Sequence, residues 1–93
     1  MPFQLVIEKQ AEKELLSIKD KALKERIGLK IAKLKDNPYP ADSVILKGNA
    51  KGFRRLRIGK YRVVYMVDGQ KIYIVLICLR DKVYKMFQQM IWG

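Results

Sequence analysis

The pattern of hydrophobic and polar positions divides the chain into short elements. Residues 3–7 are mostly apolar and predict a short first strand. The apolar positions then change to a spacing of three and four residues, which indicates an amphipathic helix with Ala11, Leu15, Ile18 and Ala22 on one stripe.

A second helix is predicted directly after the first. Asp20 is a residue type that caps helix N-termini, and the stripe that follows it is narrow: Leu23, Ile27, Ile31 and Leu34. Basic side chains flank this stripe, either as a solvated face or as contacts to an anionic partner: Arg26, Lys30 and Lys33 on one side, Lys24 and Lys35 on the other. Asn37-Pro38 ends the helix, because the residue before a proline is disfavoured in the α region. Two close helices predict a helical hairpin that covers one face of a sheet, followed by a loop to Gly52.

The segment 53–65, with the sequence FRRLRIGKYRVVY, predicts a β-hairpin. A two-residue turn at Gly59-Lys60 pairs Arg57 with Arg62 and Arg55 with Val64. Alternation then gives one apolar face, made of Leu56, Ile58, Tyr61, Val63 and Tyr65. Arg55, Arg57 and Arg62 share the other face. Since like charges placed opposite one another are destabilising, this arrangement indicates a site for an anion.

A third strand is predicted over residues 72–79, apolar on both faces and therefore in the interior of the sheet. Asp68-Gly69 is a strong hairpin signal. A two-residue loop at these positions would pair Arg62 with Val75 and place Arg80 on the face away from the other arginines. A three-residue loop, a bulge or an earlier strand end would bring Arg80 to them, and the sequence leaves these alternatives open.

The last segment, residues 83–92, has apolar positions at near-helical spacing and predicts a short amphipathic helix. This helix either packs on the sheet in the ordinary way or is a detachable element that takes part in a partner contact. The expected fold class is α+β: an N-terminal strand, a two-helix hairpin, an antiparallel sheet of three further strands and a short C-terminal helix. We expect residues 1–93 to form a single domain.

The charge of the chain is concentrated in its second half. The 93 residues carry a net charge of +11. Residues 1–46 have nine cations against seven acids, whereas residues 47–93 have eleven cations against two acids. Repulsion on this scale opposes compaction, so an anionic partner is expected, either a nucleic acid or an acidic protein.

Composition also excludes several kinds of site. The chain has no histidine and one cysteine, which excludes a zinc site, a histidine-based triad and an intrachain disulfide. Cys78 lies in an apolar run and is expected to be a buried hydrophobe. That run has eight residues, far fewer than the ~20 that a membrane-spanning helix needs. No long apolar region follows the N-terminus, so we expect a cytoplasmic protein.

With these residues described, the sequence resembles the RelE/ParE toxin superfamily, and within it the RelE branch. The resemblance covers nearly the whole chain and is carried by these motifs in order: Asn37-Pro38, Leu46-Lys47-Gly48, Arg55-Leu56-Arg57-Ile58-Gly59, Tyr61-Arg62-Val63-Val64-Tyr65, Arg80 and Val83-Tyr84. It implies a small α+β domain in which a sheet packs against two helices. RelE-like members cut messenger RNA in the ribosomal A site and are held inactive by an antitoxin.

The resemblance also implies roles for particular residues. The catalytic arginines correspond to Arg62 and Arg80, and the C-terminal tyrosine to Tyr84. A basic residue that is lysine in some RelE proteins corresponds to Arg55. A second such lysine corresponds to Phe53, with Arg54 and Lys51 nearby. No cofactor and no metal are implied.

The chemistry of these residue types fits RNA cleavage by the 2′-hydroxyl. Guanidinium groups hold phosphate oxygens in bidentate fashion, but arginine is not a ready base near neutral pH. Acid–base help is expected from Tyr84, from Lys51 or Lys60, or from outside the protein, so alignment of the RNA becomes important. Further RNA contacts are expected from Lys47, Lys51, Arg54, Arg57, Lys60 and Lys82. Lys47 and Lys51 are equally consistent with solvated loop charges. For Arg57, a structural role or a general electrostatic one is favoured over direct catalysis.

Three functions are therefore considered. The leading hypothesis is a metal-independent, ribosome-dependent messenger RNA endonuclease, the toxin of a type II toxin–antitoxin system. The alternatives are a ParE-like inhibitor of DNA gyrase and a non-catalytic RNA- or ribosome-binding domain. The expected partners are the ribosome, messenger RNA and an acidic RelB-like antitoxin in a hetero-oligomer, with no membrane.

Overall fold

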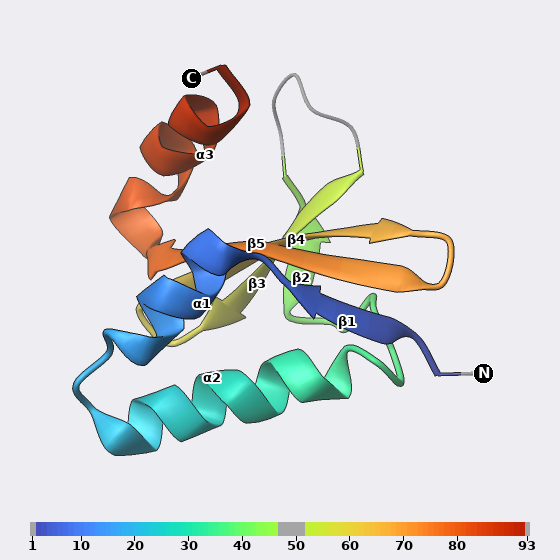
Figure 1. The fold of residues 1–93 in the computed structure, drawn as a ribbon, viewed down its shortest axis with the longest axis horizontal. Helices are drawn as coiled ribbons and strands as arrows, with labels where there is room; N and C mark the ends of the chain where they lie inside the picture. Colours follow the sequence, from blue (N-terminus) through green and yellow to red (C-terminus); the bar gives the residue numbers. More distant parts are fainter. Residues whose placement is uncertain (1, 47–51, 93) are drawn as a thin grey trace.

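The chain folds as a mixed five-stranded sheet with helices on both of its faces. A computed structural model describes residues 2–46 and 52–92. The strands are β1 (Gln4–Ile7), β2 (Ser43–Ile45), β3 (Phe53–Ile58), β4 (Tyr61–Asp68) and β5 (Lys71–Leu79). The helices are α1 (Lys9–Leu16), α2 (Lys21–Lys33), the short 3₁₀ helix η1 (Arg80–Lys82) and α3 (Val83–Trp92). Figure 1 shows α1 and α2 together along one side of the sheet, and α3 extending away from them beyond the end of β5.

The strand order is β1-β5-β4-β3-β2. β1 runs parallel to β5, and the other neighbours are antiparallel. The predicted α+β fold, with its helical hairpin and C-terminal helix, is confirmed. The sheet nevertheless has one strand more than predicted, because β2 adds to the edge of β3. Its Val44 and Ile45 are exposed, so no buried alternation marked it in the sequence.

The helical hairpin is shorter at its first helix than predicted. α1 ends at Leu16, and Asp20 caps α2 by accepting a hydrogen bond from the Leu23 backbone nitrogen at 3.2 Å. Ile18 therefore lies in the connection, where it is buried, while Ala22 belongs to α2 and is exposed rather than on the stripe of the first helix. The predicted stripe of α2 is confirmed.

Two hydrophobic clusters lie on the two faces of the sheet. The larger one joins α1 and α2 to the apolar face of the hairpin, and its largest buried side chain is Tyr65, whose hydroxyl donates to the Pro38 carbonyl at 2.7 Å. The smaller one joins Val83 and Phe87 of α3 to Val64 and Leu76 on the opposite face. The arginines predicted to bind an anion share this second face, so α3 and the candidate site divide it between them.

β5 contains a β-bulge near its middle. Tyr65 pairs with Ile74, whereas Val64 pairs with Leu76, so Val75 is an extra residue without an opposite partner. The bulge moves every later residue of β5 to the other face. The turn before it also differs from the prediction, because Asp68 pairs with Lys71 and the two turn residues are Gly69 and Gln70. Gly69 has φ of 59°, which suits the first position of a type II′ turn.

Candidate phosphate-binding site

The arginine face of the β3–β4 hairpin is the first part of the candidate site. The predicted register is confirmed: Arg57 lies opposite Arg62, and Arg55 opposite Val64, around a turn at Gly59-Lys60. The three arginines line one open cavity of about 370 Å³ with Ala41, Asp42 and Val44 from the loop and strand beside them. The predicted arginine face therefore lines an open cavity on the sheet face that α3 leaves free.

Arg62 is held in place by the turn that precedes its strand. Its Nη1 atom donates to the carbonyl oxygen of Gly59 at 3.0 Å and to that of Tyr61 at 2.9 Å. Burial, followed by the charges of Arg55, Arg57 and Arg80, lowers the pKa of Arg62 below its usual value. The guanidinium stays protonated near neutral pH, but this shift shows that cations are crowded around it.

Arg80 joins the other arginines, which settles the alternatives left open by the sequence. The bulge places Cys78 opposite Arg62, and β5 ends at Leu79, so Arg80 begins η1. Its backbone nitrogen donates to the Lys60 carbonyl at 2.8 Å, which ties the start of η1 to the β3–β4 turn. Both a bulge and a strand end are thus responsible.

A second cavity, of about 380 Å³, lies next to the first one. Its lining comes from α2, the loop before β2, the β3–β4 hairpin and η1: Arg26, Lys30, Asp42, Arg57, Gly59, Arg62 and Arg80. Lys30 and Asp42 form an ion pair in its wall. The hydrogen bond from Lys30 is the main reason that the pKa of Asp42 lies below its usual value.

Tyr84 lies at the edge of the first cavity and contacts one of its arginines. Arg55 Nη1 donates to the Tyr84 hydroxyl at 3.0 Å, and the Arg55 guanidinium carbon lies 5.6 Å from the centre of the tyrosine ring. A hydroxyl that accepts one hydrogen bond keeps its own hydrogen to donate. The candidate catalytic residues Arg55, Arg62, Arg80 and Tyr84 are therefore gathered in one region.

Only some of the expected RNA-binding residues lie at the two cavities, among them Arg57. Arg54 points to the opposite face, where its Nη2 donates to Ser43 Oγ at 3.0 Å and its guanidinium stacks on Tyr39 at 5.1 Å, so the fold does not bring it to the cavities. Lys60 and Lys82 are exposed at the turn and in η1. Lys47 and Lys51, like the Lys47-Gly48 part of the predicted loop motif, lie outside the described residues.

Two features of the site are not evident from the sequence. Asp42 is the only acid between residues 37 and 67, yet that isolation alone does not indicate that it lines both cavities. Arg26 is predicted only as a flank of the α2 stripe, and the approach of α2 to the β3–β4 turn brings it into the second cavity.

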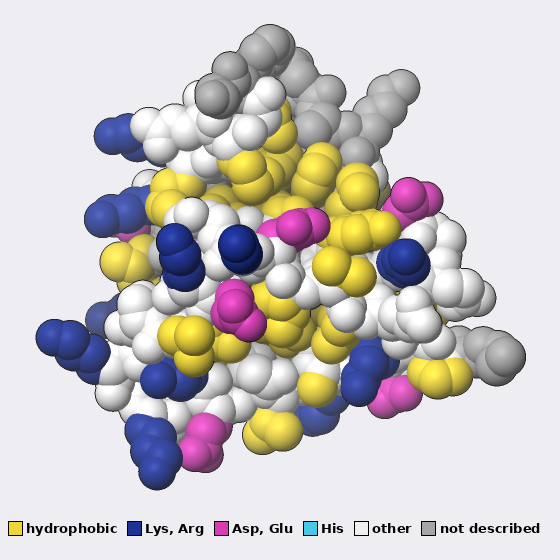
Figure 2. All heavy atoms as spheres, in the orientation of Figure 1, with side chains coloured by type: hydrophobic (Ala, Val, Ile, Leu, Met, Phe, Trp, Pro, Cys, Tyr) yellow, Lys and Arg dark blue, Asp and Glu magenta, His cyan; other side chains and the backbone are white. Residues whose placement is uncertain are grey.

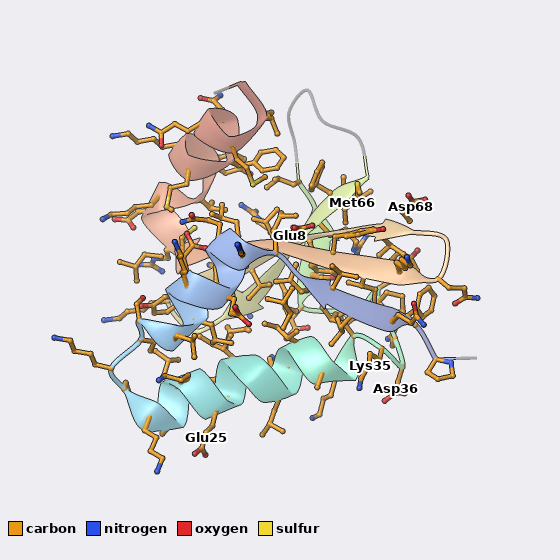
Figure 3. The ribbon with its side chains drawn as sticks, viewed as in Figure 1. Glu8, Glu25, Lys35, Asp36, Met66 and Asp68 are labelled. Atoms are coloured by element: carbon orange, nitrogen blue, oxygen red, sulfur yellow. The ribbon has the colours of Figure 1, made fainter. Side chains whose placement is uncertain are left out.

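The acids of the chain mostly lie away from these cavities. Figure 3 shows Glu25 projecting from α2 away from the sheet, and Asp68 at the β4–β5 turn, the opposite end of β4 from Gly59. On the side of the molecule shown in Figure 2, Lys and Arg are interspersed with Asp and Glu. Within residues 2–46 and 52–92, Lys30–Asp42 is the only ion pair. The arginines therefore meet little opposing charge from the protein itself, and a phosphate group would supply it.

Comparisons with known proteins identify the family of the chain. Residues 5–84 match the family described as ParE toxin of type II toxin-antitoxin system, parDE. No curated protein sequence matches closely enough to add to this result.

Solved structures show the same fold. A chain of the archaeal RelE–RelB complex from Pyrococcus horikoshii is 31% identical with a TM-score of 0.74, over 86% of this chain and 97% of that chain. A mutant of the toxin RelE from E. coli in the free state is 20% identical with a TM-score of 0.74, over 91% of this chain and 93% of that chain. The YoeB dimer from Staphylococcus aureus is 22% identical with a TM-score of 0.70, over 85% and 97%. The last two comparisons support the fold alone.

The family match covers most of the chain, and the resemblance to the RelE/ParE superfamily seen in the sequence is confirmed. The chain belongs to the ParE toxin family of type II toxin–antitoxin systems, within the RelE/ParE superfamily.

Proposed function

We propose that this toxin is a ribosome-dependent endonuclease that cleaves messenger RNA in the A site without a metal ion. The observation that carries the proposal is that Arg55 and Arg62 line one open cavity, with Tyr84 hydrogen-bonded to Arg55 and with Arg80 beside Arg62 in the adjoining cavity. Three arginines and a tyrosine hydroxyl in contact with one of them suit a reacting phosphate better than a general acidic surface.

The proposed reaction is attack of the RNA 2′-oxygen on the adjacent phosphorus. The P–O5′ bond breaks, a 2′,3′-cyclic phosphate forms, the 2′-hydroxyl gives its proton to solvent water, and the leaving 5′-oxygen gains one from Tyr84. Arg62 and Arg80 stabilise the charge that develops on the phosphate oxygens, and one such group is typically worth ~10²–10³ in rate. Tyr84 donates the proton to the leaving oxygen, since its hydroxyl accepts from Arg55 and keeps its hydrogen.

The described residues that line the two cavities include no strong general base. Asp42 is the one carboxylate among the described residues that line the two cavities, and its lowered pKa makes it a poor base. Acid–base catalysis is ordinarily worth ~10²–10⁴, so a site with little of it depends on alignment of the RNA. This supports a toxin that acts where the ribosome holds its substrate, in the cytoplasm.

Primer extension on translating ribosomes tests the proposal. Wild-type toxin should give cuts in A-site codons, and Arg62→Ala and Arg80→Ala should lose them by ~10²-fold or more. Lys71→Ala is the matched control, because it removes an exposed cation at the start of β5, opposite the last residue of β4 and far from Arg62, and should cut normally. Absence of cuts from folded wild-type toxin rejects the proposal.

A second candidate function is inhibition of DNA gyrase, which the match to the ParE family favours. The same basic face would then contact the enzyme or its DNA. A supercoiling assay separates the two functions, since a nuclease leaves gyrase active and a ParE-like inhibitor does not cut RNA.

The proposed partner is an acidic antitoxin in a hetero-oligomer. Similar structures include the complexes RelE–RelB from Pyrococcus horikoshii, RelB–RelE from Methanococcus jannaschii and YoeB–YefM from Staphylococcus aureus. This chain supports such a contact with its +11 charge and with exposed apolar side chains: Leu16, Leu29, Val44, Ile45 and Met90. Copurification with the product of a neighbouring acidic reading frame should survive high salt. Dissociation by salt alone contradicts an apolar contribution.

A further inference from the structure

We propose that the second cavity, between α2, the β3–β4 turn and η1, binds an RNA phosphate next to the one that reacts. This inference rests on the proposed nuclease function and extends it to a second contact on the same strand. Its defining residue is Arg26 of α2, which none of the sequence motifs includes.

Arg26 reaches from α2 to the turn of the hairpin. A Cβ atom built on Gly59 would lie 3.8 Å from Arg26 Nη1, so the guanidinium lies beside the turn backbone. Gly59 has φ of 58°, as the first position of a type II′ turn requires, and it lines the cavity together with Arg26. Helix, turn and η1 thereby enclose one hollow from three directions.

The charge of this hollow calls for an anion. Five of its lining residues are cations and one is an acid. That acid, Asp42, is already paired with Lys30, and the described part of the chain supplies no further ion pair. Arg26 and Arg57 are exposed, so a flanking phosphate can approach them from solvent, while Arg80 is assigned to the phosphate that reacts.

The two cavities are adjacent, because Asp42, Arg57 and Arg62 line both. Tyr84 contacts Arg55 in the first, while Arg26 lies only in the second. One RNA strand that places its reacting phosphate by Arg55 and Tyr84 would place a flanking phosphate by Arg26. The geometry therefore favours the substrate strand over a separate RNA as the source of this phosphate.

Binding of a short 2′-O-methyl oligoribonucleotide, which cannot be cut, tests the site directly. For single strands the slope of log K against log salt concentration changes by about 0.7 for each phosphate contact. Arg26→Gln should make the slope shallower by about this amount, and Arg26→Lys should restore most of it because the charge returns. Lys21→Gln is the control, since it removes an exposed cation from the same helix that lines neither cavity.

Two arms identify the source of the phosphate. Neutral methylphosphonate linkages are placed in turn on either side of the central nucleotide of the oligonucleotide. At one position the replacement should weaken wild-type binding and have no further effect in Arg26→Gln. If every linkage weakens both proteins equally, or if the slope does not change in Arg26→Gln, the site is not a contact of the substrate strand and the inference is overturned.

The cleavage assay and the binding assay together distinguish a failure of the second site from a failure of the nuclease proposal. Cuts on ribosomes together with Arg26-independent binding reject the second site alone. Absence of cuts together with Arg26-dependent binding rejects the nuclease and keeps a phosphate site. Circular dichroism melting of Arg26→Gln, an exposed substitution, should match the wild type and excludes unfolding as the cause.

Discussion

At the scale of single residues, Arg62 has a structural task and, in the proposed reaction, a chemical one. Its Nη1 atom donates to the carbonyl oxygens of Gly59 and Tyr61, which leaves Nη2 and Nε to donate to an anion. A residue anchored in this way is already oriented before the substrate arrives, so less conformational freedom is lost on binding.

Arg62→Lys tests whether charge alone is sufficient. Lysine keeps the charge but lacks the planar fork that donates to the turn and to phosphate together. We expect a loss of cleavage rate close to that of Arg62→Ala, ~10²-fold or more, measured in single turnover on ribosomes. A lysine variant with nearly normal rate would mean that anchoring at the turn is unimportant.

Cys78 should be chemically inert in the folded protein. Burial raises the pKa of its thiol to about 11, so little thiolate is present at pH 8. Alkylation by iodoacetamide should be slow in the native state and fast in urea. Because the folded state holds the thiol proton more tightly than the unfolded state does, the protonated thiol favours folding. This contribution is present below the unfolded pKa of about 8.5 and declines as the pH rises towards the folded pKa of about 11. Rapid native labelling at pH 8 contradicts this burial.

Most of the arginines at the candidate site could be placed together from the sequence, for a physical reason. A glycine turn between alternating strands determines which side chains share a face, so Arg55, Arg57 and Arg62 could be placed together. Asp42 and Arg26 could not, because their positions depend on how α2 and the loop after it pack against the sheet. Contacts of that kind leave no local pattern.

At the scale of elements, the bulge in β5 is supported from α1. Glu14 Oε1 accepts a hydrogen bond from the Ile77 backbone nitrogen at 2.8 Å, two residues after the extra Val75. Gln10 donates to the other oxygen of Glu14 at 3.1 Å. Neither the bulge nor this support was predictable, since Ile74 to Cys78 is apolar in either register. β2 was missed for a related reason, as its three residues contain no buried alternation.

Glu14→Ala should therefore destabilise the fold. Hydrogen bonds that involve a charged group contribute roughly 1.5–3 kcal/mol, and Glu14→Gln should lose less because its side-chain oxygen still accepts. Urea unfolding of the three proteins provides the comparison. Equal stability of the alanine variant and the wild type would show that the bulge needs no support from α1.

The Lys30–Asp42 pair connects α2 to the loop before β2, and its contribution should depend on pH. The pKa of Asp42 is lowered in the folded state, chiefly by the hydrogen bond from Lys30. Its stabilising effect is therefore present above the unfolded pKa of about 3.9 and is lost as the pH falls through the lower folded value. Asp42→Asn should melt at a lower temperature than the wild type at pH 7, with the difference closing in strong acid. A difference that persists there assigns the effect to packing.

At the scale of the whole molecule, charge and stability oppose one another. The second half of the sequence carries nearly all of the excess positive charge, and the fold concentrates part of it around Arg62 instead of spreading it. Such a surface favours fast association with anions and disfavours the isolated folded state.

No helix in the described part of the chain is long and apolar enough to cross a membrane.

Removing one of the clustered charges should stabilise the protein. Arg57 lies opposite Arg62 and is exposed, and like charges in this position are destabilising. Arg57→Gln should therefore raise the melting temperature in low salt, and the gain should shrink at high salt because screening weakens the repulsion. A lower melting temperature in low salt would show that Arg57 is compensated by groups such as Asp42.

The extra residue in β5 has a consequence for how the chain can change in length. Val75 sets which side each later side chain occupies, from Leu76 to the start of η1. Losing or gaining a single residue there would exchange the two sides, moving Cys78 from the α3 side of the sheet to the side of α1 and α2 and carrying Arg80 away from Arg62. A change of two residues would preserve the sides. Insertions and deletions in this strand should therefore be tolerated in pairs, much as a coding sequence tolerates them in threes.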